Sequence, residues 1–373
     1  MIKVGSDFSG VGAFNQALIR LGIEYKEVFA CDMDKYARQT FIHNYGQPEY
    51  YPTNVYDRDI PTESLDIYMT SPPCQAFSLA GKRLGKDDKR GILFFNSHEF
   101  IQVNKPRYFI FENVKGLLSD DNGKTFSEWV NLLGGKSVNG NPVLFPYEDA
   151  VPYHLYWQVL NAKHYGVPQN RERVFLIGIR DDKDNNFRFP AQEPLVKRLK
   201  DVLEDSVDDK YFLSEKTIES IMKSNFEDCK PMDFSREDYR KENISKCIKV
   251  GGDVPCFLVK SATSKGYEEA TCNQGVMVGD YRTDEGFRWR ADGNSPAIMA
   301  MMRDTWKENF TGQNPPIINK DYKIRRLTPR ECFRLMDFPD TFTWPVSDSQ
   351  AYKQAGNSIV VNVLYKILSN LNL

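Results

Sequence analysis

The sequence predicts an α/β fold built on a parallel sheet, followed by a smaller and less regular region. Three observations support this prediction. Short apolar runs typical of buried strands alternate with helical patterns along the first half of the chain. Glycines come directly after the first run, and polar residues follow several of the others. Because open α/β sheets bind ligands at the carboxyl ends of their strands, we expect a site at that edge.

The first element is a strand at Lys3–Gly5 that leads into a glycine turn and a helix. The turn is Asp7–Ala13, DFSGVGA, and apolar residues then recur at helical spacing at Phe14, Ala17, Leu18 and Leu21. A second strand, Val28–Asp32, ends in an acid about 20 residues past the glycines, where such folds hydrogen-bond a ribose. Asn15 replaces the third glycine of the dinucleotide fingerprint, which favours a nucleoside cofactor without a diphosphate. A purely structural tight turn stays open as the alternative.

The third strand presents a thiol. Leu65–Met69 is an apolar run typical of a buried parallel strand, and Ser71–Gln75 follows it with the sequence SPPCQ. The two prolines fix φ and remove two backbone donors, so Cys74 is held on a stiff loop at the carboxyl end of the strand. A buried structural cysteine is the commoner interpretation of a single Cys, and only the surrounding residues can overturn it.

Two later strands add a carboxyl group and two guanidinium groups. The strand Tyr108–Phe111 runs directly into Glu112, at the rim of the same sheet. Before the apolar strand Val174–Ile179, strand alternation places Arg171 and Arg173 on one face. Each of these side chains alone also fits an ordinary solvated or paired group. Together they predict a thiol, a carboxyl and paired guanidinium groups near one edge.

These residues resemble the C5-cytosine-specific DNA methyltransferase family of bacterial and phage restriction-modification systems, from near residue 4 to residue 373. The matching blocks, in the order of the family, are DFSGVGAF, CDMDKYA, SPPCQAFSLAGKR, RGILFF, ENVKGLL, QNRERVF, RRLTPRECFRLMDFPD and GNSIVVNV. The resemblance implies a Rossmann-like, S-adenosylmethionine-dependent methyltransferase domain at 1–189, completed by 350–373. It also implies a smaller, irregular target-recognition domain, which together with its hinge spans 190–349.

The resemblance implies methyl transfer from S-adenosyl-L-methionine to C5 of a cytosine flipped out of a specific double-stranded DNA sequence. Cys74 would add to C6 as a thiolate, which makes C5 an enamine carbon able to attack the methyl group. Glu112 would bind the N3 and N4 edge of the cytosine and assist protonation at N3. Arg173 would hold O2, and Arg171 would lie by the new bond. A stacked base cannot reach such a pocket, so the cytosine must leave the helix.

The resemblance also assigns binding residues. Those for the cofactor are Phe8 against the adenine, Gly10 and Gly12 along the methionine portion, Asp32 at the ribose, and Met33, Asn54, Pro73, Leu93 and Asn357. Those for DNA are Gln75, Ser78, Arg90, Gln169, Arg288 and Arg290. The basic, glycine-punctuated segment 78–91 is expected to be a closing lid that contacts phosphates. Departures from the family are Met33 in place of an aromatic residue, Asn54 in place of an acid, Ala13 in place of a glycine, and an acid at Asp7, one place later than usual.

Further helices are predicted toward the carboxyl terminus. Thr328–Glu331 is a capping box with proline at the first helical position, which predicts a helix through Met336. Ser214–Met222 is typical of a capped helix. Ser358–Leu371 predicts an amphipathic helix, which the resemblance packs against the first domain.

Composition agrees with this interpretation only loosely. The formal net charge is −2, so any DNA-binding surface must be a local concentration of Lys and Arg. The seven cysteines lack zinc-site spacing, which predicts neither a metal site nor a disulfide framework. No apolar stretch approaches the length of a membrane span. We expect a monomer in the bacterial cytoplasm, associated with the nucleoid through DNA, with double-stranded DNA as its partner and a cognate restriction endonuclease as a functional one.

Three alternatives remain open. A tRNA or RNA cytosine-C5 methyltransferase would have the same fold, but Ala262–Tyr267 keeps only the second half of the element typical of the transfer-RNA branch. A nicotinamide or flavin oxidoreductase is disfavoured by Asn15. A catalytically silent DNA-binding protein is disfavoured by the intact set of Cys74, Glu112 and Arg173, and a methyl-transfer assay distinguishes it from an enzyme.

Overall fold

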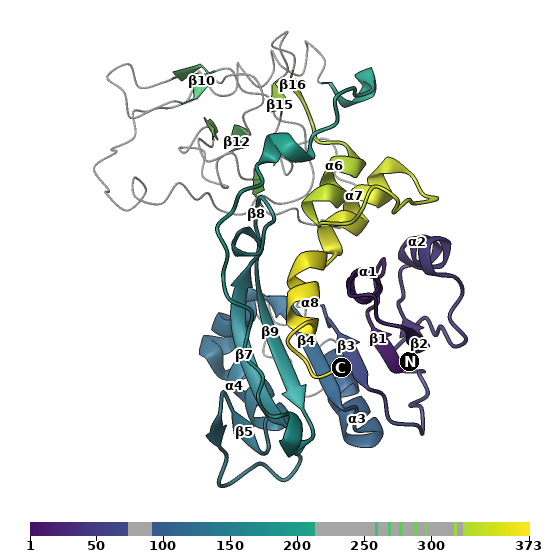
Figure 1. Cartoon of the computed structure of the whole chain (residues 1–373), viewed down its shortest axis with the longest axis vertical. Helices are drawn as coiled ribbons and strands as arrows, with labels where there is room; N and C mark the ends of the chain where they lie inside the picture. Colours follow the sequence, from purple (N-terminus) through teal and green to yellow (C-terminus); the bar gives the residue numbers. More distant parts are fainter. Residues whose placement is uncertain are drawn as a thin grey trace.

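An eight-stranded sheet forms the centre of the protein, in the order β2-β1-β3-β4-β9-β7-β5-β6 (Figure 1). The computed structural model describes residues 1–73, 92–212 and 324–373, and the backbone of short strand segments between 258 and 318. The strands of the sheet are β1 (Ile2–Asp7), β2 (Tyr25–Cys31), β3 (Ile67–Thr70), β4 (Tyr108–Val114), β5 (Ser137–Val138), β6 (Asn141–Pro142), β7 (His154–Asn161) and β9 (Glu172–Ile179). The described helices are α1 (Ala13–Arg20), α2 (Lys35–Tyr45), α3 (Ile92–Asn104), α4 (Lys124–Leu133), α6 (Pro329–Leu335), α7 (Asp348–Asn357) and α8 (Val361–Leu368).

The direction of the strands determines which residues meet at the edge. β1 pairs in parallel with β2 and β3, and β3 pairs in parallel with β4, as the apolar runs predict. β9 instead runs antiparallel to both β4 and β7. The beginning of β9 therefore meets the end of β4, and the register places Arg173 opposite Val114. This antiparallel pairing brings the arginine block to the edge at which the parallel strands end.

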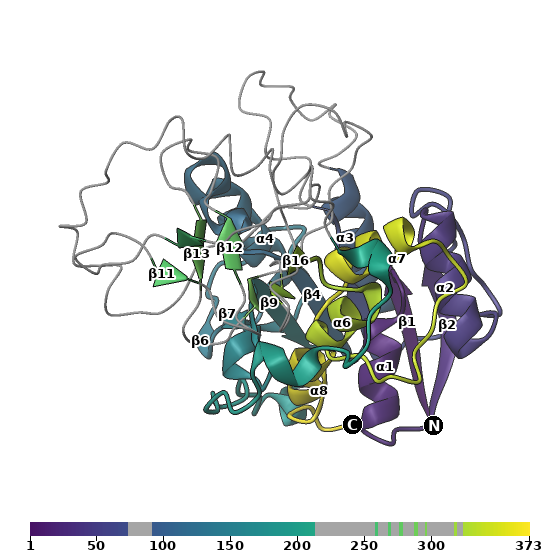
Figure 2. The same cartoon turned by 90° about the horizontal axis from the view of Figure 1, so that it is seen from above.

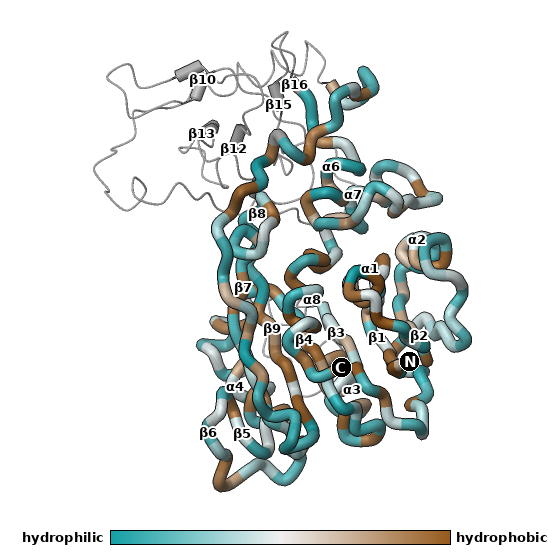
Figure 3. The backbone as a smooth tube through the Cα atoms, viewed as in Figure 1, coloured by the Kyte–Doolittle hydropathy of each residue, from teal (hydrophilic) through white to brown (hydrophobic). Residues whose placement is uncertain are grey.

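Side chains of successive strand residues enter two apolar clusters, one on each face of the sheet. Met69, Ile110 and Ile177 belong to the cluster that includes α1, α6 and α8. On the other face, Phe109 and Leu176 belong to the cluster that includes α3 and α4. Strand alternation explains this division, and Figure 3 shows the hydrophobic residues along β9. A sheet covered on both faces by helices is the arrangement that near-continuous apolar strands require.

Helix α6 begins as the sequence predicts. Thr328 Oγ1 accepts from the Glu331 backbone N–H (3.2 Å), and Glu331 Oε2 accepts from the Thr328 N–H (2.8 Å), with Pro329 at the first helical position. The helix ends at Leu335, one residue before the predicted Met336. The capping box is confirmed, because its hydrogen bonds lie within four consecutive residues. The helix predicted at 214–222 lies outside the described residues.

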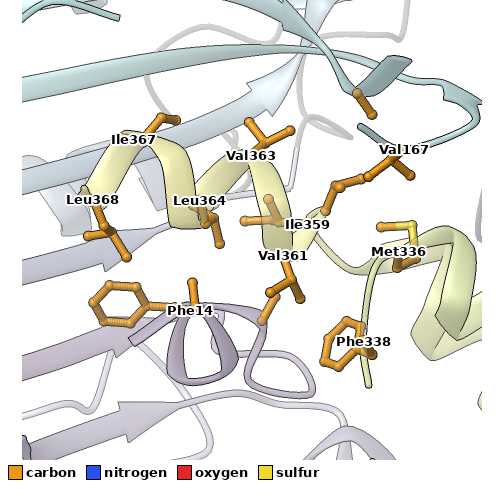
Figure 4. Packing of buried hydrophobic residues seen from close by; sticks show 14 of the residues in the cluster. Phe14, Val167, Met336, Phe338, Ile359, Val361, Val363, Leu364, Ile367 and Leu368 are labelled. Carbon is orange, nitrogen blue, oxygen red and sulfur yellow. The ribbon is translucent and has the colours of Figure 1, made fainter. Parts of the chain in front are cut away.

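The amphipathic helix at the carboxyl terminus is confirmed as α8, which is shorter than the predicted 358–371. Phe14 of α1 belongs to the same buried cluster as Val361, Leu364 and Leu368 of α8 (Figure 4). Seen from above, α8 also lies beside α1 (Figure 2). The helix at the end of the chain thus completes the core that the first helix begins.

Phe14→Ala is expected to lower the free energy of unfolding by about 3 to 5 kcal/mol, because it leaves a cavity between α1 and α8. Phe14 is 4% exposed. Ile19, on the same helix, is 50% exposed, and Ile19→Ala is the matched control, with an expected change within about 0.5 kcal/mol. Denaturant unfolding measures both values. Equal losses in the two variants would contradict the packing of α8 on α1.

The predicted domain boundaries stay a prediction, but the packing of α6 bears on them. Cys332, Phe333 and Leu335 of α6 lie in the same cluster as α1 and α8. Tyr211 lies near the point at which the described chain leaves the first domain, and Arg326 lies near the point at which it returns. The Arg326 N–H donates to the Tyr211 carbonyl (3.0 Å). We propose that the chain rejoins the first domain near residue 325, earlier than the predicted residue 350.

Short strand segments are described in the region between Tyr211 and Arg326. They are β10 (Leu258–Val259), β11 (Glu268–Glu269), β12 (Val276–Val278), β13 (Phe287–Trp289), β14 (Ser295–Pro296), β15 (Ile317–Ile318) and β16 (Ile324–Arg325). β14 pairs in parallel with β8 (Gln169–Asn170), so backbone pairing joins this region to the segment that precedes β9.

Candidate active site

The candidate site lies where neighbouring strands of the sheet end together. The register aligns Cys31 with Asp7, Asp7 with Thr70, and Thr70 with Phe111. The residues that directly follow these four aligned positions in the sequence are Asp32, Phe8, Ser71 and Glu112. The carboxyl-end placement that the sequence predicts for these segments is thus found in the structure.

Glu112 is a buried acid paired with a half-buried guanidinium group. The residue lies inside β4 rather than just after the strand, and its exposed fraction is 8%. Arg173 Nε lies 3.0 Å from Glu112 Oε1. Burial raises the pKa of Glu112, while the charges of Arg173 and Arg171 oppose that rise. A buried carboxyl group with a raised pKa is suited to hold a proton near neutral pH.

Arg171 and Arg173 have different partners. Arg173 belongs to β9, and its Nη1 donates to the Glu172 carbonyl (2.8 Å). Arg171 lies between β8 and β9, so strand alternation does not place it on the face of Arg173. It is buried, and its Nη2 donates to the carbonyls of Gly356 and Ser358 (2.8 Å each). These bonds hold the backbone on either side of Asn357, the last residue of α7, whose side chain is exposed.

The loop that leads to Cys74 is tied to two neighbouring strands. Asn113 is buried, and its Nδ2 donates to the Pro72 carbonyl (3.0 Å). Ser71 Oγ donates to the Phe8 carbonyl (3.4 Å). Asn113 was not among the predicted site residues, although it directly follows Glu112 and could have been predicted from that position. The predicted site residues that follow this loop, namely Cys74, Gln75, Ser78 and Arg90, lie outside the described part of the chain.

The glycine turn after β1 has an unusual backbone. Phe8, Gly10 and Gly12 all have positive φ, at 57°, 55° and 83°. This left-handed region favours glycine, so Phe8 is held there by its surroundings. A Cβ atom on Gly12 would clash with the Tyr45 ring, whereas one on Gly10 would meet no atom of the described residues within 4 Å. The backbone at Gly10 therefore borders open space.

Asp32 connects this turn to the end of β2. Its Oδ2 accepts from the Gly10 N–H (2.7 Å), and its Oδ1 accepts from the Asp34 N–H (2.8 Å). Burial raises the pKa of Asp32, and these two backbone donors oppose the rise. A carboxylate oxygen has two acceptor positions, so both oxygens can accept a further hydroxyl donor. The open space at Gly10 and this carboxylate fit the ribose and methionine portions of S-adenosylmethionine.

The other predicted cofactor residues occupy different environments. Met33 is 85% exposed beside Asp32, and Pro73 is exposed at the end of the described loop. Asn54 forms a local turn, in which Oδ1 accepts from the Tyr56 N–H (3.1 Å) and Nδ2 donates to Asp57 Oδ2 (3.3 Å). Leu93 is half-buried in the first turn of α3. Their contact with the cofactor stays a prediction.

The residues predicted to bind DNA are only partly described. Gln169 is fully buried, and its Nε2 donates to the Leu335 carbonyl at the end of α6 (2.7 Å). This burial argues against the predicted DNA contact of Gln169, because a fully buried side chain has no surface for a duplex. Arg288 lies in β13, where only the backbone is described, opposite Met277 of β12. Arg290 lies outside the described residues.

Gly10→Ala is expected to weaken S-adenosylmethionine binding by at least about tenfold, because the added methyl group would occupy the open space beside the turn. Gly22→Ala is the matched control. Gly22 also has a positive φ, 68°, and also has nothing within 4 Å of its added Cβ atom. Both variants should therefore lose a similar free energy of unfolding, about 1 kcal/mol. Calorimetric titration with the cofactor should distinguish them, and equal affinities would remove the cofactor from this turn.

Comparison with known proteins identifies the family. The model of the C-5 cytosine-specific DNA methylase family matches residues 2–372. Type II methyltransferase M.HpaII of Haemophilus parainfluenzae is 33% identical over 373 residues, which cover 98% of this chain and 88% of the relative. Orphan methyltransferase M.SPRI of Bacillus phage SPR is 30% identical over 443 residues, with coverage of 99% and 97%.

Solved structures agree on the fold. DNMT2 of Spodoptera frugiperda has a TM-score of 0.65 at 18% identity, covering 99% of both chains. Dnmt2 methyltransferase of S. pombe has a TM-score of 0.60 at 18% identity, covering 99% of this chain and 97% of that one. Within the described residues, no helix is long and apolar enough to cross a membrane. The chain therefore belongs to the C-5 cytosine-specific DNA methylase family, with the Rossmann-like fold of S-adenosylmethionine-dependent methyltransferases, and it is a DNA (cytosine-5-)-methyltransferase.

Proposed function

We propose that the enzyme methylates C5 of a cytosine flipped out of a specific double-stranded DNA sequence, through a covalent bond between Cys74 Sγ and cytosine C6. The observation that carries this proposal is the pair of Glu112 and Arg173 beside the Pro72–Pro73 loop. This geometry supports the proposal, because a carboxyl group suited to hold a proton lies beside the loop that precedes Cys74 in the sequence. S-adenosylmethionine, when bound, supplies the methyl group.

The protein groups divide the reaction into two easier steps. As the Cys74 thiolate forms a bond to C6, the electrons of the C5–C6 bond move into the ring, and protonated Glu112 donates its proton to N3. C5 would then have enamine character and form the new bond to the methyl carbon, while the bond from that carbon to the cofactor sulfur would break and leave its electron pair on the sulfur. Transfer of the C5 proton to solvent restores the C5–C6 double bond as the thiolate departs from C6, and N3 returns its proton to the Glu112 carboxylate.

Arg173 is proposed to perform two tasks at once. Its Nε holds Glu112 Oε1, which orients the carboxyl group. Neither of these two contacts uses Nη2, so we assign this atom as the donor to cytosine O2. Arg171 is proposed to act on the site of the new bond indirectly. Its Nη2 is bound to the backbone carbonyls on either side of Asn357, so it holds that part of the backbone in place.

Expression in a host that lacks cytosine methylation, followed by bisulfite sequencing of the host DNA, tests this function. We expect protected cytosines within one recurring sequence, which identifies both the activity and the recognition site. An unmodified genome would contradict DNA methylation. Methylation of RNA from the same cells would instead establish the RNA cytosine methyltransferase alternative.

We propose that the enzyme acts as a monomer on the DNA of a bacterial cytoplasm. The curated relatives include type II methyltransferases of bacteria and orphan methyltransferases of phages, which supports this setting. A cognate endonuclease would be a functional partner. Sedimentation with and without a target duplex tests the monomer.

A further inference from the structure

We propose that Arg58 is a positioning residue for the cofactor site, because its buried guanidinium joins the three segments that carry Phe8, Asn54 and Leu93. This inference rests on the proposed function and on the cofactor contacts that the family resemblance assigns to those three residues. Arg58 lies in the loop after α2, and its side chain is 2% exposed.

The first connection runs from Arg58 to the end of β1. Arg58 Nε forms an ion pair with Asp7 Oδ1 at 2.9 Å, and both side chains are buried. The Tyr68 hydroxyl of β3 donates to the other oxygen, Asp7 Oδ2, at 2.5 Å. Asp7 directly precedes Phe8, whose positive φ must be held by its surroundings. The ion pair therefore anchors the backbone immediately before the residue placed against the adenine.

The second connection runs from Arg58 to α3. Arg58 Nη2 donates to the carbonyl of Asn96 at 3.3 Å, three residues after Leu93 on the same helix. The guanidinium also lies over the Phe100 ring, with Cζ 4.6 Å from its centroid. Arg58 itself follows Asn54 by four residues, beyond the turn made by the Asn54 side chain. One side chain thus connects three segments at the cofactor edge, namely the end of β1, helix α3 and the loop that carries Asn54.

A contribution to stability alone does not explain this arrangement. A buried ion pair costs desolvation of two charges, and well-packed apolar residues in its place are often as stable. Apolar side chains could fill the same volume between Phe29 and Phe100, but they would form neither the ion pair with Asp7 nor the hydrogen bond to the Asn96 carbonyl. The distinct property of Arg58 is therefore orientation, which predicts an effect on cofactor affinity that is separable from stability.

The test measures S-adenosylmethionine affinity by calorimetry and the free energy of unfolding by denaturant. Arg58→Met should weaken cofactor binding by at least about tenfold. In the double variant Asp7→Leu/Arg58→Met, no charge is left unpaired, so stability should recover while the affinity stays low. An affinity that recovers together with stability would overturn the proposal. Arg58→Lys keeps the charge if the other variants fail to fold, and wild-type affinity in that variant would also overturn it.

Two further variants complete the experiment. Arg107 pairs with Asp184 (2.8 Å) at the other end of β4, away from the cofactor residues. Arg107→Met removes that pair, so it should lower stability and leave cofactor affinity unchanged. Phe8→Ala tests the cofactor placement itself. If Phe8→Ala binds the cofactor as tightly as the wild type, the proposed site fails and the role of Arg58 fails with it. If Phe8→Ala weakens binding but Arg58→Met does not, only the role of Arg58 is wrong.

Discussion

An oligonucleotide with 5-fluorocytosine at the target position is expected to form a covalent adduct with the wild-type enzyme and none with Cys74→Ser. Fluorine cannot depart from C5 as a proton does, so the bond between the thiol and C6 persists after methyl transfer. A serine hydroxyl is a far weaker nucleophile than a thiolate, so methylation should also fall below detection. Denaturing electrophoresis and mass spectrometry of the adduct measure the outcome.

The other described cysteines are poor candidates for this role. Burial raises the pKa of Cys31 to about 12, and it raises the pKa of Cys332 well above the usual thiol value. Both thiols are therefore protonated near neutral pH, and both lie in the core. Cys332→Ala is the matched control and should form the adduct as the wild type does. An adduct that persists in Cys74→Ser would assign the nucleophile to another residue.

Local features of this protein could be predicted from the sequence because their interactions lie within a few residues. The capping box at Thr328–Glu331 is such a case, and so is the strand, glycine turn and helix around Gly10. The edge placement of Glu112 was also predictable, because parallel strands end together. The antiparallel direction of β9 was absent from the apolar pattern, since a buried strand has the same composition in either direction.

Features that depend on distant segments could not be predicted in the same way. Arg171 binds carbonyls that lie 185 and 187 residues away, so strand alternation gave no information about its partners. Gln169 is buried by the end of α6, 166 residues away, although its block had suggested a DNA contact. The ion pair between Asp7 and Arg58 likewise depends on how the loop after α2 folds over β1. In each case the partner is chosen by tertiary packing, which local sequence does not encode.

Glu112→Gln is expected to lower the rate of methyl transfer by about 10² to 10⁴, the usual contribution of a general acid. Glutamine keeps the size of the side chain and an oxygen for Arg173, but it cannot donate a proton to N3. Single-turnover methylation at saturating cofactor measures the chemical step. Glu172→Gln is the matched control, because Glu172 is a neighbouring acid that pairs with Lys115 on the surface (3.0 Å), where such pairs contribute little. A similar loss in both variants would contradict the role of Glu112.

The pH dependence of the rate should change in the same variant. Because burial raises the pKa of Glu112, the protonated acid persists closer to neutral pH than an ordinary carboxyl group does. The wild-type rate should fall as the pH rises through that pKa, while the thiol sets the opposite limit at low pH. Glu112→Gln should lose the decline on the alkaline side. A decline that persists unchanged would assign it to another group.

Glu112→Gln is also expected to raise the free energy of unfolding at mildly alkaline pH. A carboxyl group whose pKa is raised in the folded state binds protons more tightly there than in the unfolded chain. Wild-type stability therefore decreases as the pH rises from the ordinary carboxyl value of 4.5 through the raised pKa of Glu112. Below 4.5 the group is protonated in both states, so the difference between variant and wild type should vanish there. Denaturant unfolding across this range measures it. A wild type that is more stable than the variant at alkaline pH would mean that the attraction of Arg173 outweighs burial, and that Glu112 is ionised when cytosine binds.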